Sequence, residues 1–115
     1  MQIKHRIAVL GCAFLFAALS GCAHNPQFKG QSVTDPVLRK DVMKSVKLMF
    51  SAMTQCGSID TVTTTIAAIS QQPSGAVDRA TETWDVTGCG TSKSYKVELR
   101  SDARGETDYS VSPRL

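Results

Sequence analysis

The chain has 115 residues, which is enough for one small domain, and its formal net charge is +3 at pH 7. This charge is too small to indicate nucleic-acid binding, and the chain has neither an arginine-rich tract nor a nucleic-acid-binding motif. A domain of this size buries only a modest hydrophobic core, so we expect it to benefit from a covalent cross-link.

Residues 1–21 have the composition of a cleavable export signal. A short basic head at 4–6 precedes an almost unbroken apolar run at 7–19. A helix of that length extends about 20 Å, whereas the hydrocarbon core of a bilayer is roughly 30 Å thick. The run therefore predicts a signal-peptide core and not a permanent membrane span.

The signal ends in a short motif, Leu19-Ser20-Gly21-Cys22, which resembles the lipobox of bacterial lipoproteins. The resemblance implies that a peptidase cleaves before Cys22, whose thiol, as a sulfur nucleophile, carries a diacylglyceryl group. Two or three acyl chains hold a protein stably on a membrane. The following residue, Ala23, is not the aspartate that retains enteric lipoproteins in the inner membrane. The resemblance thus implies an address at the outer membrane, facing the periplasm.

Two alternatives to this anchor exist. The chain could carry an ordinary secretory signal with a chance cysteine at the cleavage point. Alternatively, Cys12 could be the lipidated residue, but only residues 7–10 would then remain as an apolar core, which is too short for export. Cys22 is therefore the preferred anchor.

We divide the chain into a signal peptide at 1–21, a lipidated tether at 22–34 and a small α+β domain at 35–115. The tether is polar, contains a proline and a glycine, and shows no periodicity, which predicts a flexible segment. Its histidine, His24, is expected to be solvated and not a ligand. Without residues 1–21 the chain keeps eleven basic and ten acidic side chains, a net charge of about +1.

A helix is predicted to begin at Pro36, after the capping residues Thr34 and Asp35. Gly57 is expected to stop this helix. A narrow apolar stripe recurs at spacings of three and four: Leu38, Val42, Val46, Met49, Met53 and Cys56. The opposite side carries Lys40, Lys44 and Lys47. We favour a solvated helix face for these lysines over a patch that faces anionic lipid or lipopolysaccharide.

Four strands are predicted after the helix. The segment 59–69 is β-branched nearly throughout, and a loop at 71–78 separates it from an alternating segment at 82–87. A Gly-Cys-Gly turn precedes the alternating segment 93–100, and a last strand covers 107–111. The expected inward side chains are Trp84, Val86, Tyr95, Val97 and Leu99. The predicted fold is one amphipathic helix packed on a four-stranded antiparallel meander sheet, a two-layer α+β sandwich.

Two cysteines, Cys56 and Cys89, keep free thiols once Cys22 is acylated and the signal is removed. An exported domain with one pair of cysteines normally joins them, so we expect a structural disulfide. A metal site would need three or four ligands, a redox pair is more often Cys-x-x-Cys, and a catalytic cysteine would need a histidine. We therefore expect no metal, no cofactor and no catalytic residue.

A second resemblance rests on Cys56-Gly57, on the Trp84-Asp85-Val86-Thr87-Gly88-Cys89-Gly90 segment and on Tyr95-Lys96-Val97. These features resemble a recurrent type of small lipoprotein in Gram-negative bacteria, and the similarity covers residues 49–111. It implies a fold but carries over no catalytic or ligand-binding residue.

Three functions compete. We favour a non-catalytic structural or interaction module of the cell envelope with an envelope protein as partner. The alternative is a periplasmic inhibitor or ligand-binding module that uses the 71–78 loop or a sheet edge. Exposure of Trp84 or Tyr109 would favour this second function, and burial of both would favour the first. A small hydrolase using Glu82, Asp85 or Asp108 is disfavoured, because acids on strands are normally solvated and a small domain offers little cleft.

Overall fold

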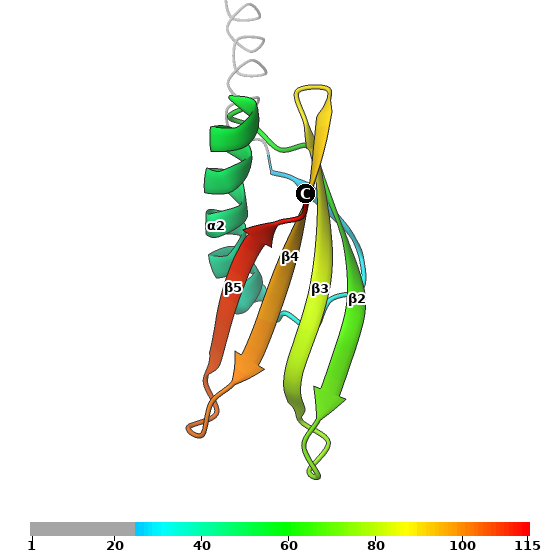
Figure 1. Cartoon of the computed structure of the whole chain (residues 1–115), viewed down its shortest axis with the longest axis vertical. Coiled ribbons are helices and arrows are strands. Elements are labelled where there is room, and N and C mark those ends of the chain that lie inside the picture. Colours follow the sequence, from blue (N-terminus) through cyan, green and yellow to red (C-terminus); the bar gives the residue numbers. More distant parts are fainter. Residues whose placement is uncertain (1–24) are drawn as a thin grey trace, which may run out of the picture.

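In the computed structural model, which describes residues 25–115, a 19-residue helix covers one face of a five-stranded mixed sheet (Figure 1). The elements in chain order are β1 (Gln27–Gly30), α2 (Pro36–Thr54), β2 (Thr61–Gln71), β3 (Val77–Gly88), β4 (Thr91–Ser101) and β5 (Thr107–Pro113). The spatial order of the strands is the same, with β1 parallel to β2 and the other pairs antiparallel. The expected α+β class is confirmed. The export signal, Cys22 and His24 lie outside the described residues.

The fifth strand, β1, corrects the expected four-stranded antiparallel sheet. Its four residues fall in the segment predicted as tether, yet they pair with β2 from Gln27 opposite Thr61 to Gly30 opposite Thr64. The connection through α2 returns the chain to the same end of the sheet, which makes the pairing parallel. Gly30 has a φ of 91°, and a Cβ there would lie 2.1 Å from the carbonyl oxygen of Thr64. Part of the expected tether therefore belongs to the folded domain.

The beginning of α2 is as predicted and its end is not. The Asp35 side chain accepts a hydrogen bond from the backbone N–H of Leu38 at 2.8 Å, and Pro36 occupies the first turn. The helix ends at Thr54, because Gln55 adopts the left-handed conformation with a φ of 59°. Gly57 is therefore not the stop residue.

The buried side of α2 is rotated from the predicted stripe. Val42 and Val46 are buried as expected, but Met43 and Phe50 complete the buried set. The other predicted positions lie at the margin: Leu38 and Met49 are partly buried, and Met53 is 38% exposed. At 100° per residue, Met43 and Phe50 lie about 60° and 40° to one side of Val46, so the buried arc is shifted from the predicted stripe. Met53 lies only about 20° to the other side, but it stands in the last turn of the helix and stays partly exposed.

Strands β3 and β4 supply the sheet side of the core as the alternation predicts. The five expected side chains are all buried: Trp84, Val86, Tyr95, Val97 and Leu99. In β2, Val62 and Thr64 are buried, but a bulge between Ile66 and Ala68 shifts the register with β3, and Ala68 is exposed. The expected loop at 71–78 is shorter, because β2 extends to Gln71 and β3 begins at Val77.

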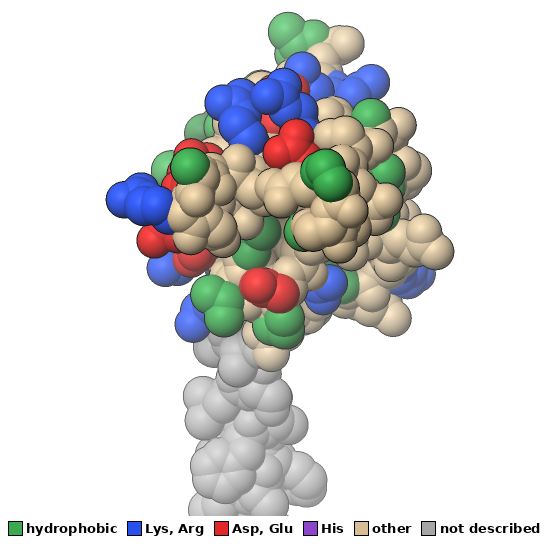
Figure 2. All heavy atoms as spheres, turned by 90° about the horizontal axis from the view of Figure 1, so that it is seen from below, with side chains coloured by type: hydrophobic (Ala, Val, Ile, Leu, Met, Phe, Trp, Pro, Cys, Tyr) green, Lys and Arg blue, Asp and Glu red, His purple; other side chains and the backbone are tan. Residues whose placement is uncertain are grey.

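Three hairpin turns connect β2 to β5. The β3–β4 turn consists of Cys89 and Gly90, whose φ values of 51° and 72° have the pattern of a type I′ turn. It lies at the end of the sheet opposite the β2–β3 and β4–β5 loops (Figure 1). Seen from the end with those two loops, basic and acidic side chains are interspersed and hydrophobic ones form small separate patches (Figure 2).

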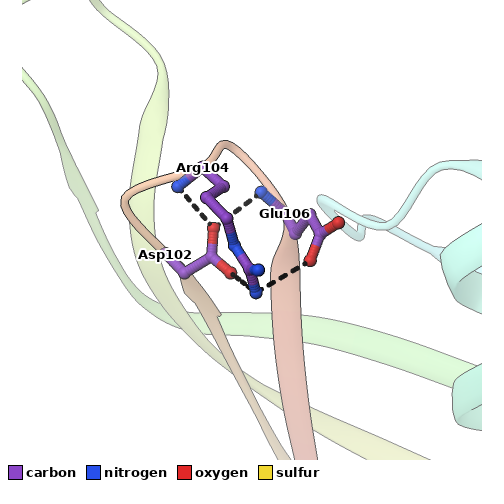
Figure 3. A network of polar contacts seen from close by, with 3 residues as sticks. All are labelled: Asp102, Arg104 and Glu106. Atoms are coloured by element: carbon purple, nitrogen blue, oxygen red, sulfur yellow. Dashed lines mark hydrogen bonds and ion pairs between the residues drawn. The ribbon is translucent and has the colours of Figure 1, made fainter.

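The β4–β5 loop is organised by one carboxylate. Asp102 accepts hydrogen bonds from the backbone N–H groups of Arg104 and Glu106 at 2.8 and 2.9 Å (Figure 3). The hydrogen bond from the backbone of Glu106 is the largest of the effects that lower the pKa of Asp102. The guanidinium of Arg104 lies 3.5 Å from Asp102 and 3.4 Å from Glu106, but it is exposed, so these ion pairs add little stability.

Candidate functional site

The two expected cysteines form a disulfide. Cys56 follows α2 and is buried, and Cys89 is the first residue of the β3–β4 turn, with 6.0 Å between the two Cα atoms. The bond ties the end of the helix to the turn. Gly88 permits this approach, because a Cβ there would lie only 2.3 Å from the carbonyl oxygen of Ser58.

A second cluster surrounds Glu82, which is fully buried on the same side of β3 as Trp84. Its Oε1 accepts a hydrogen bond from the indole Nε1 of Trp84 at 2.8 Å, and its Oε2 accepts one from the backbone N–H of Val33 at 2.7 Å. The hydroxyl of Ser32 donates to the same carboxyl group, at 2.8 Å from Oε1 and 3.1 Å from Oε2. Three donors therefore converge on one carboxyl group, one from the same strand and two from residues about 50 positions earlier in the chain.

The cluster continues to the start of α2. Ser32 Oγ lies 2.7 Å from the hydroxyl of Thr34, and the Nε of Arg39 donates to that hydroxyl over 3.4 Å. The guanidinium of Arg39 also stacks over the ring of Phe28 at 5.0 Å. Phe28 in turn meets Trp84 edge-on, with 5.9 Å between ring centroids. These contacts hold β1 and the β1–α2 connection against the sheet.

The three carboxylates considered for hydrolysis do not form a common site. Glu82 is enclosed and saturated with donors, which corrects the expectation that it is solvated. Asp85 is exposed and accepts a hydrogen bond from Ser94 across the β3–β4 pair. Asp108 is exposed on β5. Within residues 25–115, no three or more His, Cys, Asp and Glu side chains gather in a way that could hold a metal ion.

An open hollow with a volume of about 500 Å³ lies between β1 and α2. Its apolar lining comes from the segment before and within β1 and from the inner margin of the helix, and its rim is basic. The lining residues are Asn25, Pro26, Phe28, Pro36, Arg39, Lys40, Met43, Lys44 and Lys47. We call this hollow the β1–α2 groove.

The outer side of α2 borders this groove. Lys40, Lys44 and Lys47 are exposed there, on the side expected from the sequence. Beside them, at neighbouring positions around the helix, lie two large apolar side chains, Val37 and Leu48, which are 72% and 74% exposed. We call these five residues the basic face of α2. This face combines three cationic side chains with two exposed apolar side chains that do not pack in the core.

Sequence reasoning missed both the Glu82 cluster and the groove. The first had a usable signal, because Glu82 shares its parity with Trp84 and Val86 in an alternating strand. The second had none, because the groove depends on β1, and only Phe28 in that strand is a large apolar residue.

No helix within residues 25–115 combines the length and hydropathy that a bilayer crossing requires. Comparisons of the chain with protein-family models, with curated proteins and with solved structures gave no match.

Proposed function

We propose that the protein is a lipoprotein anchored through Cys22 to the outer membrane, facing the periplasm. Its domain would serve as a non-catalytic structural or interaction module of the cell envelope. The motif at residues 19–22 is the sequence basis for the anchor. The structural observation that supports export is the Cys56–Cys89 disulfide. Disulfides persist in oxidising compartments such as the periplasm and are rare in the cytosol.

A non-catalytic role is supported by the environment of the acidic side chains. Glu82 is closed off from solvent, and all three of its partners are donors. Two of them, Ser32 and Val33, hold the β1–α2 connection on the sheet, and the third is Trp84 on the same strand. Asp85 and Asp108 lie exposed on strands with no histidine in the described residues to act with them. The buried cluster thus has an architectural explanation that needs no substrate.

The anchor is tested by cell fractionation and palmitate labelling. Cys22→Ala should move the protein from the membrane to the soluble periplasmic fraction and abolish labelling, whereas Cys12→Ala serves as the matched control and should change neither. Density-gradient separation of the two membranes then tests the outer-membrane address. Labelling that survives in Cys22→Ala and disappears in Cys12→Ala would show that the anchor is misassigned.

The second candidate, an inhibitor or ligand-binding module, is favoured by one observation. Tyr109 on the outer strand β5 is 37% exposed, although Trp84 is fully buried. The Tyr109 hydroxyl donates to the backbone oxygen of Asp41 at 3.1 Å and so links β5 to α2. This contact gives Tyr109 a structural role, so its partial exposure needs no ligand to explain it. We therefore prefer the structural or interaction module.

Crosslinking in the cell envelope separates these two candidates. A binding module should capture a partner through the Tyr109 ring, so Tyr109→Ala should abolish capture while Tyr109→Phe, which keeps the ring, retains it. Equal capture by the three proteins would remove Tyr109 from any binding surface and leave the first proposal standing.

A further inference from the structure

We infer that the basic face of α2 docks on the anionic headgroups of a phospholipid membrane. This surface consists of Lys40, Lys44 and Lys47 with Val37 and Leu48. The inference deepens the proposed function, on which it rests, because it assigns the anchored domain an orientation on the membrane that holds it.

Charge is the first argument. Helix α2 carries four basic residues and one acidic residue, Asp41. Asp41 is partly buried and lies one helical turn from Val37 and Lys44, and its backbone oxygen accepts the hydrogen bond from Tyr109. Among residues 25–115, Lys40, Lys44 and Lys47 have no carboxylate within ion-pair distance. In contrast, Lys96 lies 3.9 Å from Glu98. The three lysines are therefore free to meet phosphate groups of lipids.

Exposed apolar side chains are the second argument. Val37 and Leu48 are eleven positions apart, so they lie within about 20° of each other around the helix. Both are exposed next to the row of lysines, and no described element covers the outer side of α2 (Figure 1). Apolar side chains next to lysines on one helix face are suited to the boundary between headgroups and acyl chains.

The position of the proposed anchor is the third argument and selects a membrane over a soluble anion. Asn25 lines the same β1–α2 groove as Lys40, Lys44 and Lys47. Cys22 lies three residues earlier, and three residues of extended chain span at most about 11 Å. An acylated Cys22 would therefore keep this side of the domain close to the headgroups, where a few cations act most strongly.

The first experiment uses residues 23–115 without the acyl chains, so it does not depend on lipidation. This chain contains every described element and the disulfide. Co-sedimentation would compare vesicles of phosphatidylcholine alone with vesicles containing phosphatidylglycerol, at low ionic strength. We expect binding only to the anionic vesicles. Each lysine near the surface should contribute about fivefold, so replacing Lys40, Lys44 and Lys47 by glutamine should lower partitioning about 100-fold.

The matched control replaces Lys29, Lys93 and Lys96 by glutamine, which removes the same charge from other parts of the molecule. It should retain most of the binding. Equal losses in the two triple variants would show an effect of net charge alone and would overturn the inference, as would equal binding to both kinds of vesicle. Displacement by inorganic phosphate at constant ionic strength would indicate a free-anion site and would also overturn it.

A second measurement uses the anchored full-length mature protein in the same vesicles. Amine acylation followed by peptide mass spectrometry should show Lys40, Lys44 and Lys47 protected in anionic vesicles relative to neutral ones, with Lys93 labelled equally in both. Equal labelling of all four would refute the docking. The mass of the N-terminal peptide reports acylation of Cys22 separately, so failure of the anchor and failure of the docking surface are distinguishable.

Discussion

Replacing Glu82 by glutamine should lower the free energy of unfolding by about 2 kcal/mol. The carboxyl group has two oxygens that accept from three donors, on Trp84, Val33 and Ser32. Glutamine keeps one accepting oxygen and replaces the other with an NH₂ group. If the NH₂ group takes the place of Oε2 it faces the N–H of Val33, and if it takes the place of Oε1 it faces the indole N–H of Trp84.

Either orientation leaves one buried donor opposed by another donor. An unsatisfied buried donor costs about 1–3 kcal/mol, and relief of the burial of a carboxylate offsets part of this. The remaining loss of about 2 kcal/mol corresponds to a decrease in melting temperature of roughly 8–16 °C for a domain of this size.

The assay is thermal and urea unfolding followed by circular dichroism, with Glu98→Gln as the matched control. Glu98 is exposed on the adjacent strand, so the same chemical change there should alter stability by less than about 0.5 kcal/mol. Equal stability of the two variants would refute the reasoning, because it would mean that the three donors find other partners or that the cluster is open to water.

Three further outcomes are expected. Unreduced, denatured protein should show no free thiol at Cys56 or Cys89, and reduction should lower stability by about 3–4 kcal/mol for a separation of 33 residues; two titratable thiols would contradict this. Gly88→Ala should destabilise the fold by about 1–3 kcal/mol because of its close backbone neighbour, whereas Gly57→Ala, with nothing within 4 Å, should be nearly neutral; similar losses would argue against the close approach. Because folding lowers the pKa of Asp102, its contribution to the free energy of unfolding is present above about pH 4 and declines as the pH falls further. Asp102→Asn should therefore weaken the loss of stability in acid. Carboxyl NMR showing an unshifted or raised pKa of Asp102 would refute this.

The parts of the fold that could be predicted from sequence are those set by local pattern. In β3 and β4, aromatic and branched side chains occupy every second position, so the inward set followed from alternation alone. The start of α2 followed from Asp35 and Pro36, whose preferences are local. The cysteine pair followed from the chemistry of the expected compartment.

The parts that failed depend on contacts between distant residues. Strand β1 is four residues long, and it is held by pairing with β2 and by the packing of Phe28 on Trp84, 56 positions later. Burial of Glu82 requires donors from Ser32 and Val33, which are 50 and 49 residues away. Strand β1 leaves no pattern within a short window of sequence, and the alternation in β3 indicates the side on which Glu82 lies but not its donors.

The lengths of the strands have a consequence for molecules held side by side on a membrane. The two outer strands, β1 and β5, have four and seven residues, whereas the three inner strands have eleven or twelve. The free backbone of an outer strand is a template for strand addition between molecules, and short or charged outer strands oppose it. Along β5, Asp108 is exposed and Pro113 lacks an N–H to donate. Acyl anchors would confine many copies of the protein to two dimensions, where encounters between them are frequent. A sheet with longer outer strands would polymerise laterally at such a density. The short outer strands of this domain would let the copies remain dispersed.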